Sequence, residues 1–551
     1  MNKLLAGVVA AVEEEGRALR EEFHRPGGPR GHGGSAPIDE EIERRLLAKL
    51  QALLPCAFAG EETGHTPARG EGHDECVWLI DPQDGTSEFL KGRRGSAVSV
   101  ALLKDRVPVL GVVCSPLSPD RGWDTIAWAE GGPLLRNGAA VQTTFAKSPR
   151  LVWCTASSAA RPGTFSRAAL PARYVAMPSI AYRLARVAAG DGLATLSTHP
   201  VNEYDFAAGM ALLRACGGAL VDAEGRDITL TGDAERRVSG LFAGERETIL
   251  RLCAFPWASL DAEPKRAARV TPRFPRRRDD ARLSRGAGCL LGLVIGESLQ
   301  APSKYHTLPG QPADGGEMAL VLSRSILSHR AFRREEVLTA YRDWLQTRPV
   351  DVGATVERGL LGLHTTESES NGALPRIAPI GVWAAGDPAR AAAAAREDCA
   401  LTHPNPVCLD ASAAYAAAIA AGVAGGDAQA MLEAARAHAG SRVRAALAGP
   451  ASGRTDGTVL GSLRHAFGCL GRTDFEAAVR ETAAQSGDND AAVTGALLGA
   501  ALGRDALPAH LVLAVLACRP LDAAGALRPR PMDCWPDDIL DVAEGLLEIG
   551  V

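Results

Sequence analysis

The sequence predicts two domains of different fold class, a mixed α/β domain followed by an all-α domain. Before about residue 257, β-rich runs such as CVWLIDP, SAVSVALL and PVLGVVCSP alternate with turn residues and helical segments. After about residue 284, alanine-rich helical patterns such as LDASAAYAAAIAAGVAGG prevail. The stretch between them is rich in proline and arginine, and we interpret it as a linker instead of a basic arm for a polyanion. We therefore expect an α/β domain at 1–257, a linker at 258–283 and an all-α domain at 284–551.

The composition excludes several classes of function. A chain of 551 residues with a net charge of -5 gives no reason to expect a nucleic-acid or membrane partner. No stretch approaches the roughly 20 apolar residues that a membrane span needs. The twelve cysteines are scattered without any C-x-x-C pair, which is typical of reduced thiols in the cytosol. We expect a cytoplasmic protein.

The first element expected is an amphipathic helix. The start, MNKLLAGVVAAVEEEG, imitates a signal peptide because Lys3 precedes the apolar run from Leu4 to Val12. Three glutamates follow at once, and GRALREEF continues the helical pattern, which favours a helix of the folded protein. Further along, SAPIDEEIERRLL sets Asp39 at the start of another helix, where an acid is commonly a cap.

The segment LIDPQDGTSEFLKG carries two carboxylates at the end of an apolar run. CVWLI should be a buried strand that delivers Asp81 at its end, and Pro82 should end its pairing. Asp81 and Asp84 then face the same small volume, together with the carbonyl of Gln83. Two carboxylates this close repel, and the ordinary remedy is a hard divalent cation with oxygen ligands.

The same segment predicts a place for a phosphate. Gly85 allows a sharp turn into a helix that begins near Thr86. The free N–H groups of Gly85, Thr86 and Ser87 would point into the volume that the two aspartates face, which suits an anion. The alternative is an Asx-rich turn with an ordinary helix cap, which explains most short D-x-x-D-G stretches.

Two further segments each add an acid. FAGEETGH places Glu61 after an apolar stretch, where a strand end would supply a carboxylate. VNEYDFAAGMALLRACGG puts Asp205 at the head of an apolar helix, where the alternative is an acid stabilised by the helix dipole.

Taken in order, the acid-headed helix, GEE, DPQDGT and EYDFAAG running into CGG resemble the inositol monophosphatase superfamily of Mg²⁺-dependent, lithium-sensitive phosphatases. The resemblance covers essentially the whole first half and implies a layered α/β sugar-phosphatase fold. DPQDGTSEFLKG and MPSIAYRLARVAAGDGLATLSTHPVNEYD are more similar to the 3′(2′),5′-bisphosphate nucleotidase branch. The usual Gly-Ser-Ser and Lys of that branch appear here as Pro178-Ser179-Ile180 and Arg183.

The resemblance implies a role for each matched residue. It assigns one Mg²⁺ to Glu61, Asp81 and the Gln83 carbonyl, and a second to Asp81, Asp84 and Asp205. Besides Glu61, the implied catalytic residues are Thr86, which takes a proton from water, and Asp39, which orients Thr86. The substrate-binding residues expected are Gly85, Thr86, Ser87, Lys91, Ser179 and Glu203. Lys91 has an alternative as a solvated lysine just past a helix turn.

One departure from the superfamily concerns a further metal. Members have Thr or Ser shortly before the acid matched by Asp39, and a lysine before that. This chain has Ala36-Pro37-Ile38 after the glycine-rich RPGGPRGHGGS. The first two metal sites are complete, and the resemblance links the segment before Asp39 to a third site. We therefore expect two or three Mg²⁺ ions in this domain.

The second half resembles the ADP-ribosylglycohydrolases, all-α hydrolases with a dinuclear Mg²⁺ or Mn²⁺ centre. SRGAGCLLGLVIGESLQAP by itself reads as a core helix whose glycines permit close packing. NGALPRIAP, the LTHPNP turn around His403 and GDND at 487–490 carry the resemblance, which runs from about 284 to 520.

The metal centre of that family is only partly present. Members carry Thr-Asp-Asp-Thr where this chain has Ala313-Asp314-Gly315-Gly316, and Asp490 is followed by Ala491 where they have Thr. A dinuclear site needs several oxygen ligands to offset the desolvation of two dications. We expect at most one weakly bound Mg²⁺ or Mn²⁺, and a catalytically impaired domain that binds an adenosine or ADP-ribose group. The residual site is expected at Glu297, Asp314, Asn371, Asp488 and Asp490.

The function expected is Mg²⁺-dependent hydrolysis of a small phosphate ester, by a bisphosphate nucleotidase acting on substrates of the 3′-phosphoadenosine 5′-phosphate type. An inositol or other sugar monophosphatase is the first alternative. For the second half, an active ADP-ribosylhydrolase and a non-catalytic binding or oligomerisation scaffold stay open. The sequence leaves the oligomeric state open, a homodimer included.

Overall fold

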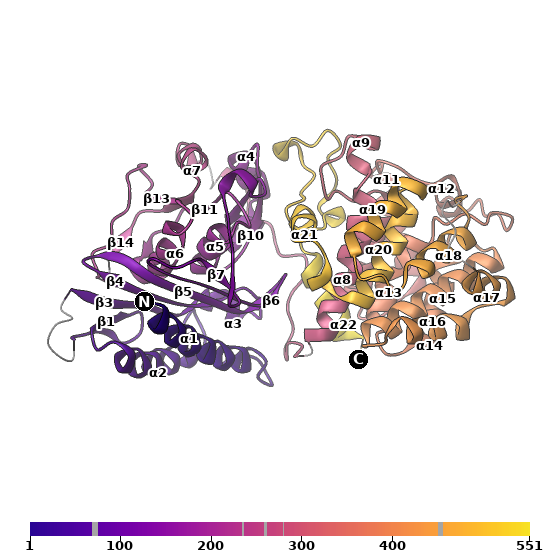
Figure 1. The fold of residues 1–551 in the computed structure, drawn as a ribbon. Coiled ribbons are helices and arrows are strands. Elements are labelled where there is room, and N and C mark those ends of the chain that lie inside the picture. Colours follow the sequence, from indigo (N-terminus) through magenta and orange to yellow (C-terminus); the bar gives the residue numbers. More distant parts are fainter. Residues whose placement is uncertain (69–74, 234–235, 258–261, 279, 450–455, 551) are drawn as a thin grey trace. The chain divides into compact units, whose positions relative to one another are not determined.

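A computed structural model describes the chain except for residues 69–74, 234–235, 258–261, 279, 450–455 and 551 (Figure 1). The chain divides into two compact units. Unit 1 comprises Met1–Ala268 and Pro272–Arg276, and unit 2 comprises Arg269–Thr271 and Arg277–Val551. Unit 1 is α/β and unit 2 is helical among its described residues, so the predicted fold classes are confirmed. Part of the expected linker, 258–261 and 279, lies outside the described residues.

Unit 1 contains a large mixed sheet in the order β2-β1-β3-β4-β5-β6-β7-β8. β1 and β3 are parallel, and the other neighbours are antiparallel. The strands predicted from CVWLIDP, SAVSVALL and PVLGVVCSP all form, as β3 to β5. The strands are β1 (Ala57–Gly60), β2 (Gly64–Thr66), β3 (Cys76–Asp84), β4 (Ala97–Lys104), β5 (Val107–Ser118), β6 (Gly122–Ala129), β7 (Leu135–Arg136) and β8 (Ala139–Ala140).

Helices and a second sheet complete the layers of unit 1. α1 and α2 lie beside each other on one face of the large sheet, and α5 and α6 cover its other face (Figure 1). Beyond α5 and α6 lies a smaller sheet, β10-β9-β11-β15-β13, with α4 and α7 packed on it. The bounds are α1 (Asn2–Phe23), α2 (Pro37–Leu53), α3 (Thr86–Leu90), α4 (Pro162–Ala169), α5 (Ile180–Ala188), α6 (Glu203–Arg214), α7 (Arg246–Cys253), β9 (Leu151–Cys154), β10 (Arg173–Ala176), β11 (Ala194–Ser197), β12 (Val201–Asn202), β13 (Ala219–Val221), β14 (Arg237–Val238) and β15 (Leu241–Gly244).

The amphipathic first helix forms as predicted, since Leu5, Val8, Val12, Leu19 and Phe23 are buried along one side of α1. These side chains join the core between α1, α2 and the large sheet. Burying this stripe holds the helix to the sheet, as is usual for helices in folded proteins.

β3 extends further than the sequence predicted. Pro82 does not end the strand, which runs to Asp84, and Asp84 pairs with Ala97 of β4. The register between Asp81 and Asp84 is irregular, as at a β-bulge. A bulge tolerates proline because its residues need not donate to the neighbouring strand.

Unit 2 is organised around the close contact of α8 and α20, in which glycines of one helix meet glycines of the other. A Cβ atom on Gly292 would lie 2.1 Å from the backbone oxygen of Gly495, and one on Gly288 would lie 2.5 Å from that of Gly499. Only helices with small residues at these positions can approach so closely. The predicted close packing of the glycine-rich helix is confirmed.

The helices of unit 2 among the described residues are α8 (Asp280–Ser298), α9 (Ala301–Tyr305), α10 (Asp314–His329), α11 (Arg334–Gln346), α12 (Ala354–Leu360), α13 (Leu374–Trp383), α14 (Pro388–Cys399), α15 (Pro406–Val423), α16 (Ala428–His438), α17 (Ser441–Ala448), α18 (Val459–Cys469), α19 (Phe475–Ser486), α20 (Asp488–Leu502), α21 (Ala509–Leu516) and α22 (Ile539–Ile549). By length and composition α15 could cross a membrane, contrary to the expectation that no stretch comes near this. However, 78% of that stretch is buried inside the protein, as in a core helix.

Most described residues of the proline- and arginine-rich segment are exposed, but some of its side chains are anchored. Glu263 accepts hydrogen bonds from the backbone N–H groups of Gly163 and Thr164 in unit 1. Arg269 forms ion pairs with Asp537 and Asp538 in unit 2. The segment is therefore anchored at Glu263 and at Arg269.

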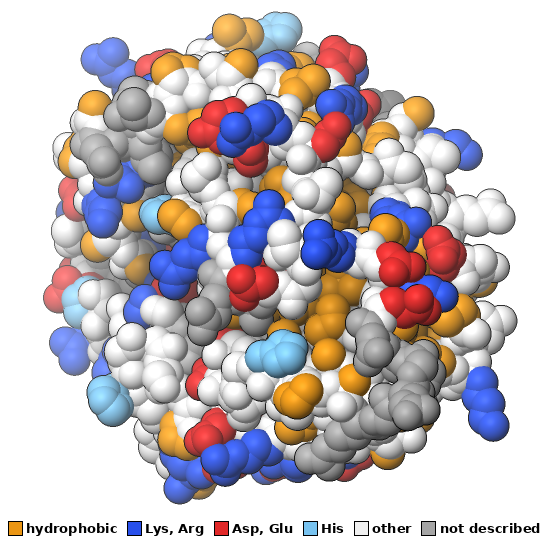
Figure 2. Space-filling model, turned by 90° about the vertical axis from the view of Figure 1, so that its left-hand side faces the viewer, with side chains coloured by type: hydrophobic (Ala, Val, Ile, Leu, Met, Phe, Trp, Pro, Cys, Tyr) orange, Lys and Arg blue, Asp and Glu red, His pale blue; other side chains and the backbone are white. Residues whose placement is uncertain are grey.

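The surface charge on the face shown and the state of the cysteines agree with what the composition indicates. The face shown in Figure 2 mixes basic and acidic side chains, without a broad field of one sign. All twelve cysteines are free thiols.

Candidate functional site

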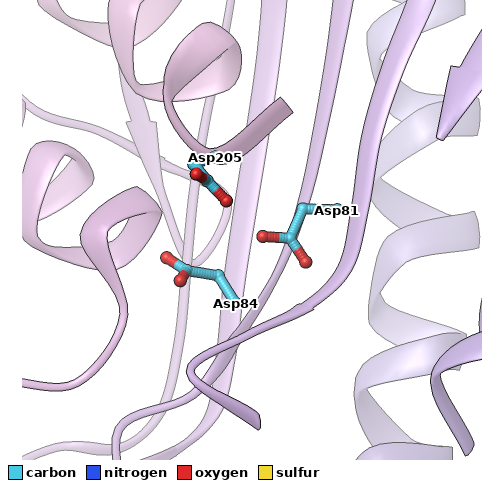
Figure 3. A group of neighbouring side chains, drawn as sticks. All are labelled: Asp81, Asp84 and Asp205. Carbon is cyan, nitrogen blue, oxygen red and sulfur yellow. The ribbon is translucent and has the colours of Figure 1, made fainter. Parts of the chain in front are cut away.

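Asp81, Asp84 and Asp205 meet in unit 1 (Figure 3). One carboxylate oxygen from each lies within 4.8 Å of the others. Asp81 and Asp84 belong to the end of β3, and Asp205 to the first turn of α6. Carboxylate oxygens in such a group are the ligands that hard divalent cations prefer. The sequence prediction that these three acids converge agrees with this geometry.

Each of the three carboxylates has hydrogen bonds that hold it in place. Asp81 Oδ1 accepts from the N–H of Gln83 at 2.9 Å. Asp205 Oδ2 accepts from the N–H of Asn202 at 2.6 Å, within a capping box. Asp84 Oδ2 accepts from the Ser179 hydroxyl and from the N–H of Ala181, both at 2.6 Å. These bonds hold each carboxylate in one orientation before a ligand binds.

The electrostatics of the group favour a cation. Burial, together with Glu61, Asp84 and Asp205, raises the pKa of Asp81 well above its usual value. Burial and the charges of Asp84 and Glu61 do the same to the pKa of Asp205. Burial also raises the pKa of Asp84, although its hydrogen bonds and Arg183 oppose this effect. A divalent cation would relieve the repulsion that these shifts express.

Glu61 directly follows β1 and lies beside the aspartates. Burial of its carboxyl group and repulsion from Glu62 and Asp84 raise the pKa of Glu61 to about 7, and a hydrogen bond with Asp81 opposes this effect. Part of the side chain is still exposed. The Tyr204 hydroxyl lies 3.4 Å from Glu61 Oε1. Glu61 is therefore placed to contribute to the same charged site.

Glu43 of α2 fixes the turn that carries Glu61, a role that the sequence reasoning missed. This carboxylate is fully buried and accepts hydrogen bonds from the N–H of Glu62 at 3.0 Å and the N–H of Thr63 at 2.6 Å. A Cβ atom on Gly60 would lie 2.3 Å from the Glu43 carboxylate, so a larger residue there would displace this carboxylate. The pattern of acids in PIDEEIE was the available signal, but it does not show which acid faces inward.

Thr86 and Asp39 form a hydrogen-bonded pair next to the aspartates. The Thr86 hydroxyl lies 2.8 Å from the Gln83 carbonyl oxygen and 3.3 Å from Asp39 Oδ2. Burial, with repulsion from Glu62, raises the pKa of Asp39 to about 7. The other carboxylate oxygen of Asp39 is buried without a hydrogen-bond partner. The predicted pairing of Thr86 with Asp39 thus has the expected geometry.

The turn that leads into α3 has the backbone that glycine permits. Gly85 has a φ of +99°, and α3 begins at Thr86. Thr86 is half-buried and Ser87 is exposed, so the start of this short helix is open to solvent.

Lys91 and Ser179 are placed differently from the expectation that they bind substrate. Lys91 is exposed and forms an ion pair with Glu88 at 2.6 Å, as in its alternative interpretation. Ser179 is fully buried, donates its hydroxyl to Asp84 and accepts from the N–H of Tyr182. Ser179 therefore orients Asp84, and its predicted contact with substrate stays a prediction.

Glu203 is likewise engaged by other groups of the protein. It is fully buried, and its carboxylate accepts hydrogen bonds from Thr231, Gly232 and Arg236 at 2.8–3.0 Å. These bonds fasten the loop before β14 to the start of α6. These internal partners favour a structural role for Glu203, and its predicted contact with substrate stays a prediction.

We expect Glu203→Gln to lower the free energy of unfolding by about 2–4 kcal/mol, because it removes a buried, charge-assisted network. Urea denaturation followed by fluorescence measures this loss. The KM for a phosphate ester should change little. A large rise in KM with unchanged stability would instead show that Glu203 binds substrate. Glu224→Gln, on the exposed turn that follows β13, is the control and should cost less than about 0.5 kcal/mol.

The five residues predicted to form a site in unit 2 lie at helix ends near one another. Glu297 is near the end of α8, Asp314 begins α10, and Asp488 and Asp490 lie in the first turn of α20. Asn371, which precedes α13, donates to Asp490 at 3.1 Å. Among the described residues, however, only the three aspartates of unit 1 form a group with metal-ligand spacing.

Comparison with known proteins decides the family of unit 1. Residues 2–251 match the sequence model of the inositol monophosphatase family. "Probable inositol 1-monophosphatase ImpA" of Mycobacterium tuberculosis is 31% identical over 220 residues, which cover 36% of this chain and 75% of the relative. The chain belongs to the inositol monophosphatase family. Unit 1 is thus a metal-dependent phosphatase that acts on small phosphate esters.

A second relative and a solved structure are similar to parts of this inositol monophosphatase family member. "3'(2'),5'-bisphosphate nucleotidase CysQ" of Aggregatibacter actinomycetemcomitans is 34% identical over 118 residues, or 21% of this chain and 44% of the relative. Residues 278–545 match the ADP-ribosylglycohydrolase model. The structure "ADP-ribosylglycohydrolase-related protein complex" is 23% identical, covers 49% of this chain and 100% of its own, and has a TM-score of 0.40. An inositol monophosphatase family domain is therefore joined here to an ADP-ribosylglycohydrolase-like domain.

In this inositol monophosphatase family member, we expect the three grouped aspartates to stabilise the fold when Mg²⁺ is bound and to destabilise it when Mg²⁺ is absent. Mg²⁺ at 100 times its Kd should add about 2.7 kcal/mol to the free energy of unfolding. Without metal, Asp205→Asn should raise the thermal midpoint, because it removes one of three repelling carboxylates. Differential scanning calorimetry with and without Mg²⁺ measures both effects. An Mg²⁺-dependent shift of equal size in Asp205→Asn would contradict the assignment.

Proposed function

We propose that unit 1 is a Mg²⁺-dependent phosphomonoesterase that removes a phosphate from a 3′-phosphorylated adenosine nucleotide. The observation that carries the chemistry is the convergence of Asp81, Asp84 and Asp205 beside the Thr86–Asp39 pair. Two or three Mg²⁺ ions are proposed, held by Glu61, the Gln83 carbonyl and the three aspartates. Bound Mg²⁺ would polarise the phosphate and lower the pKa of a water molecule.

The protein's own residues would supply the proton path. The Thr86 hydroxyl can take a proton from the attacking water while it passes its own to Asp39 Oδ2, 3.3 Å away. Because the pKa of Asp39 is raised to about 7, this carboxylate is suited to accept a proton near neutral pH. Asp84 is held by Ser179 and the first amides of α5, so its position is fixed before substrate binds. The backbone amides of residues 85–87 are proposed to contact the phosphate oxygens.

The choice of substrate rests on the acidic turn. DPQDGTSEFLKG is more similar to the bisphosphate nucleotidase branch, and a relative named as a bisphosphate nucleotidase is 34% identical over its matched part. An inositol monophosphatase is the second candidate, since the relative that covers more of the chain carries that name.

Hydrolysis of adenosine 3′,5′-bisphosphate and of inositol 1-phosphate by the purified chain with Mg²⁺ tests the substrate. A kcat/KM at least about tenfold higher for the nucleotide, or 1.4 kcal/mol of discrimination, is expected. Equal or faster turnover of inositol 1-phosphate would favour the second candidate. Hydrolysis of neither would contradict the proposed phosphomonoesterase.

For unit 2 we propose a domain that binds an adenosine or ADP-ribose group but is impaired as a hydrolase. The glycines at 315 and 316 and the missing threonine after Asp490 support a site with at most one Mg²⁺ or Mn²⁺. Titration of ADP-ribose into the full chain by calorimetry tests binding, and absence of heat would leave a scaffold. Release of ADP-ribose from a modified substrate with Mg²⁺ or Mn²⁺ would show an active hydrolase instead.

The cellular location and the partners of the protein are also part of the proposal. Free thiols and the buried position of α15 support a cytoplasmic protein without a membrane partner. The mixed surface charge supports a small-molecule substrate and no nucleic-acid partner. The oligomeric state stays open, a homodimer included.

A further inference from the structure

We propose that the acidic site of unit 2 is balanced by the chain's own cation, Lys304, and by helix amides, so that it binds no divalent metal. This inference rests on the second part of the proposed function, that unit 2 has lost its dinuclear chemistry. It goes further, because it names the groups that take the place of the metal. It does not depend on the phosphatase activity of unit 1.

The hydrogen-bond partners of Glu297 lie at the start of α10. Its carboxylate is fully buried and accepts hydrogen bonds from the N–H of Ala313 at 2.8 Å and the N–H of Gly316 at 3.0 Å. A Cβ atom on Gly316 would lie 2.4 Å from Glu297 Oε2. The carboxylate therefore occupies space that a side chain at position 316 would need. The partial positive charge of the helix start replaces a cation as its neighbour.

Asp488 has a cation from within the chain. The Lys304 ammonium lies 2.9 Å from Asp488 Oδ2, and the Tyr305 hydroxyl lies 3.3 Å from the same oxygen. Tyr305 also donates to Asp351, an acid that the sequence reasoning did not include. The ammonium further lies 4.5 Å from the centre of the Tyr305 ring, a cation–π contact that holds it beside Asp488.

Asp490 is likewise engaged by neutral groups of the protein. It accepts hydrogen bonds from the Ser462 hydroxyl and from the side-chain amide of Asn371. It is buried, and these bonds direct it toward α18 and the start of α13. Glu297, Asp488 and Asp490 therefore have separate partners within the protein, and among the described residues they form no group with metal-ligand spacing.

The identity of the cation supports the assignment. Lys304 is the only lysine between residues 277 and 551, where the other permanent cations are arginines. A compact ammonium approximates the size and charge density of a metal ion better than a planar guanidinium does. Lys304 is half exposed, so its replacement should not prevent folding.

Calorimetric titration with Mn²⁺ tests this inference in the full chain. The parent protein carries Asp84→Asn and Asp205→Asn, which disable the cluster of unit 1. We expect no Mn²⁺ binding by this parent. Adding Lys304→Gln should create one Mn²⁺ site per chain with an affinity at least about tenfold above any binding by the parent, because one repelling charge is replaced by a neutral group. Adding Lys304→Arg instead should leave the parent without a site.

A matched control and a stability readout complete the test. Arg480→Gln breaks an exposed ion pair with Glu476 on α19 and should create no Mn²⁺ site. Lys304→Gln should lower the thermal midpoint, and Mn²⁺ should restore it, whereas Mn²⁺ should not affect Arg480→Gln. Equal Mn²⁺ binding with and without Lys304→Gln would overturn the inference. Absence of binding in both proteins would also overturn it, since Lys304 would then not be the group that excludes the metal.

Discussion

Asp84→Asn is expected to lower kcat/KM for phosphate-ester hydrolysis by roughly 10³-fold, which corresponds to about 4 kcal/mol of transition-state stabilisation. Asp84 combines three roles that a neutral amide cannot fill together. It supplies one of the three grouped carboxylate oxygens, it accepts from Ser179 and Ala181, and it faces the buried charge of Arg183. Removing its charge weakens the attraction for a divalent cation. Initial rates at several Mg²⁺ concentrations, with and without Li⁺, measure the effect.

The control for this variant is Asp105→Asn, the same change at an exposed turn between β4 and β5. Asp105 has a φ of +50°, which asparagine tolerates, so this variant should fold and react like the wild type. Recovery of Asp84→Asn activity at high Mg²⁺ would still agree with a role in metal binding. Activity within about threefold of wild type at all Mg²⁺ concentrations would contradict it.

Thr86→Val should lower kcat by about 10²-fold or more while KM changes little, because it removes a hydroxyl that acts only as the proton moves. Valine is close in shape to threonine, so the turn at Gly85 should be preserved. The neighbouring carboxylate of Asp39 would then lose its hydrogen bond from Thr86. Pre-steady-state phosphate release separates this loss from an effect on product release.

Two companion variants make the prediction for Thr86 specific. Thr86→Ser keeps the hydroxyl and should retain most of the activity. Asp39→Asn combined with Thr86→Val should be little worse than Thr86→Val alone, because residues that act as a unit are not additive. Fully additive losses would show that Thr86 and Asp39 act independently.

The sequence predicted the main site of unit 1 because its residues stand at ends of recognisable elements. Asp81 and Asp84 follow an apolar strand, and Asp205 begins an apolar helix, so the pattern alone brings them to element ends. Pro82 was misread because a bulge cannot be seen in the apolar pattern, although it removes the need for a donor at that residue.

Tertiary contacts explain what the sequence could not show. Glu203 and Ser179 are polar residues at helix starts and therefore looked available, but the backbone around Thr231 and the carboxylate of Asp84 engage them. Glu43 is one of several acids in its segment, and only the fold shows that it faces the turn of Glu61. In unit 2, Lys304 and Asp488 are 184 residues apart, so no local pattern could indicate their ion pair.

The most direct test is a crystal of the full chain grown with Mn²⁺, with data collected near the manganese absorption edge. We expect an anomalous peak between the carboxylates of Asp81, Asp84 and Asp205, with Glu61 turned toward it. An ordered site in which these oxygens surround only water, while Mn²⁺ binds elsewhere, would contradict it.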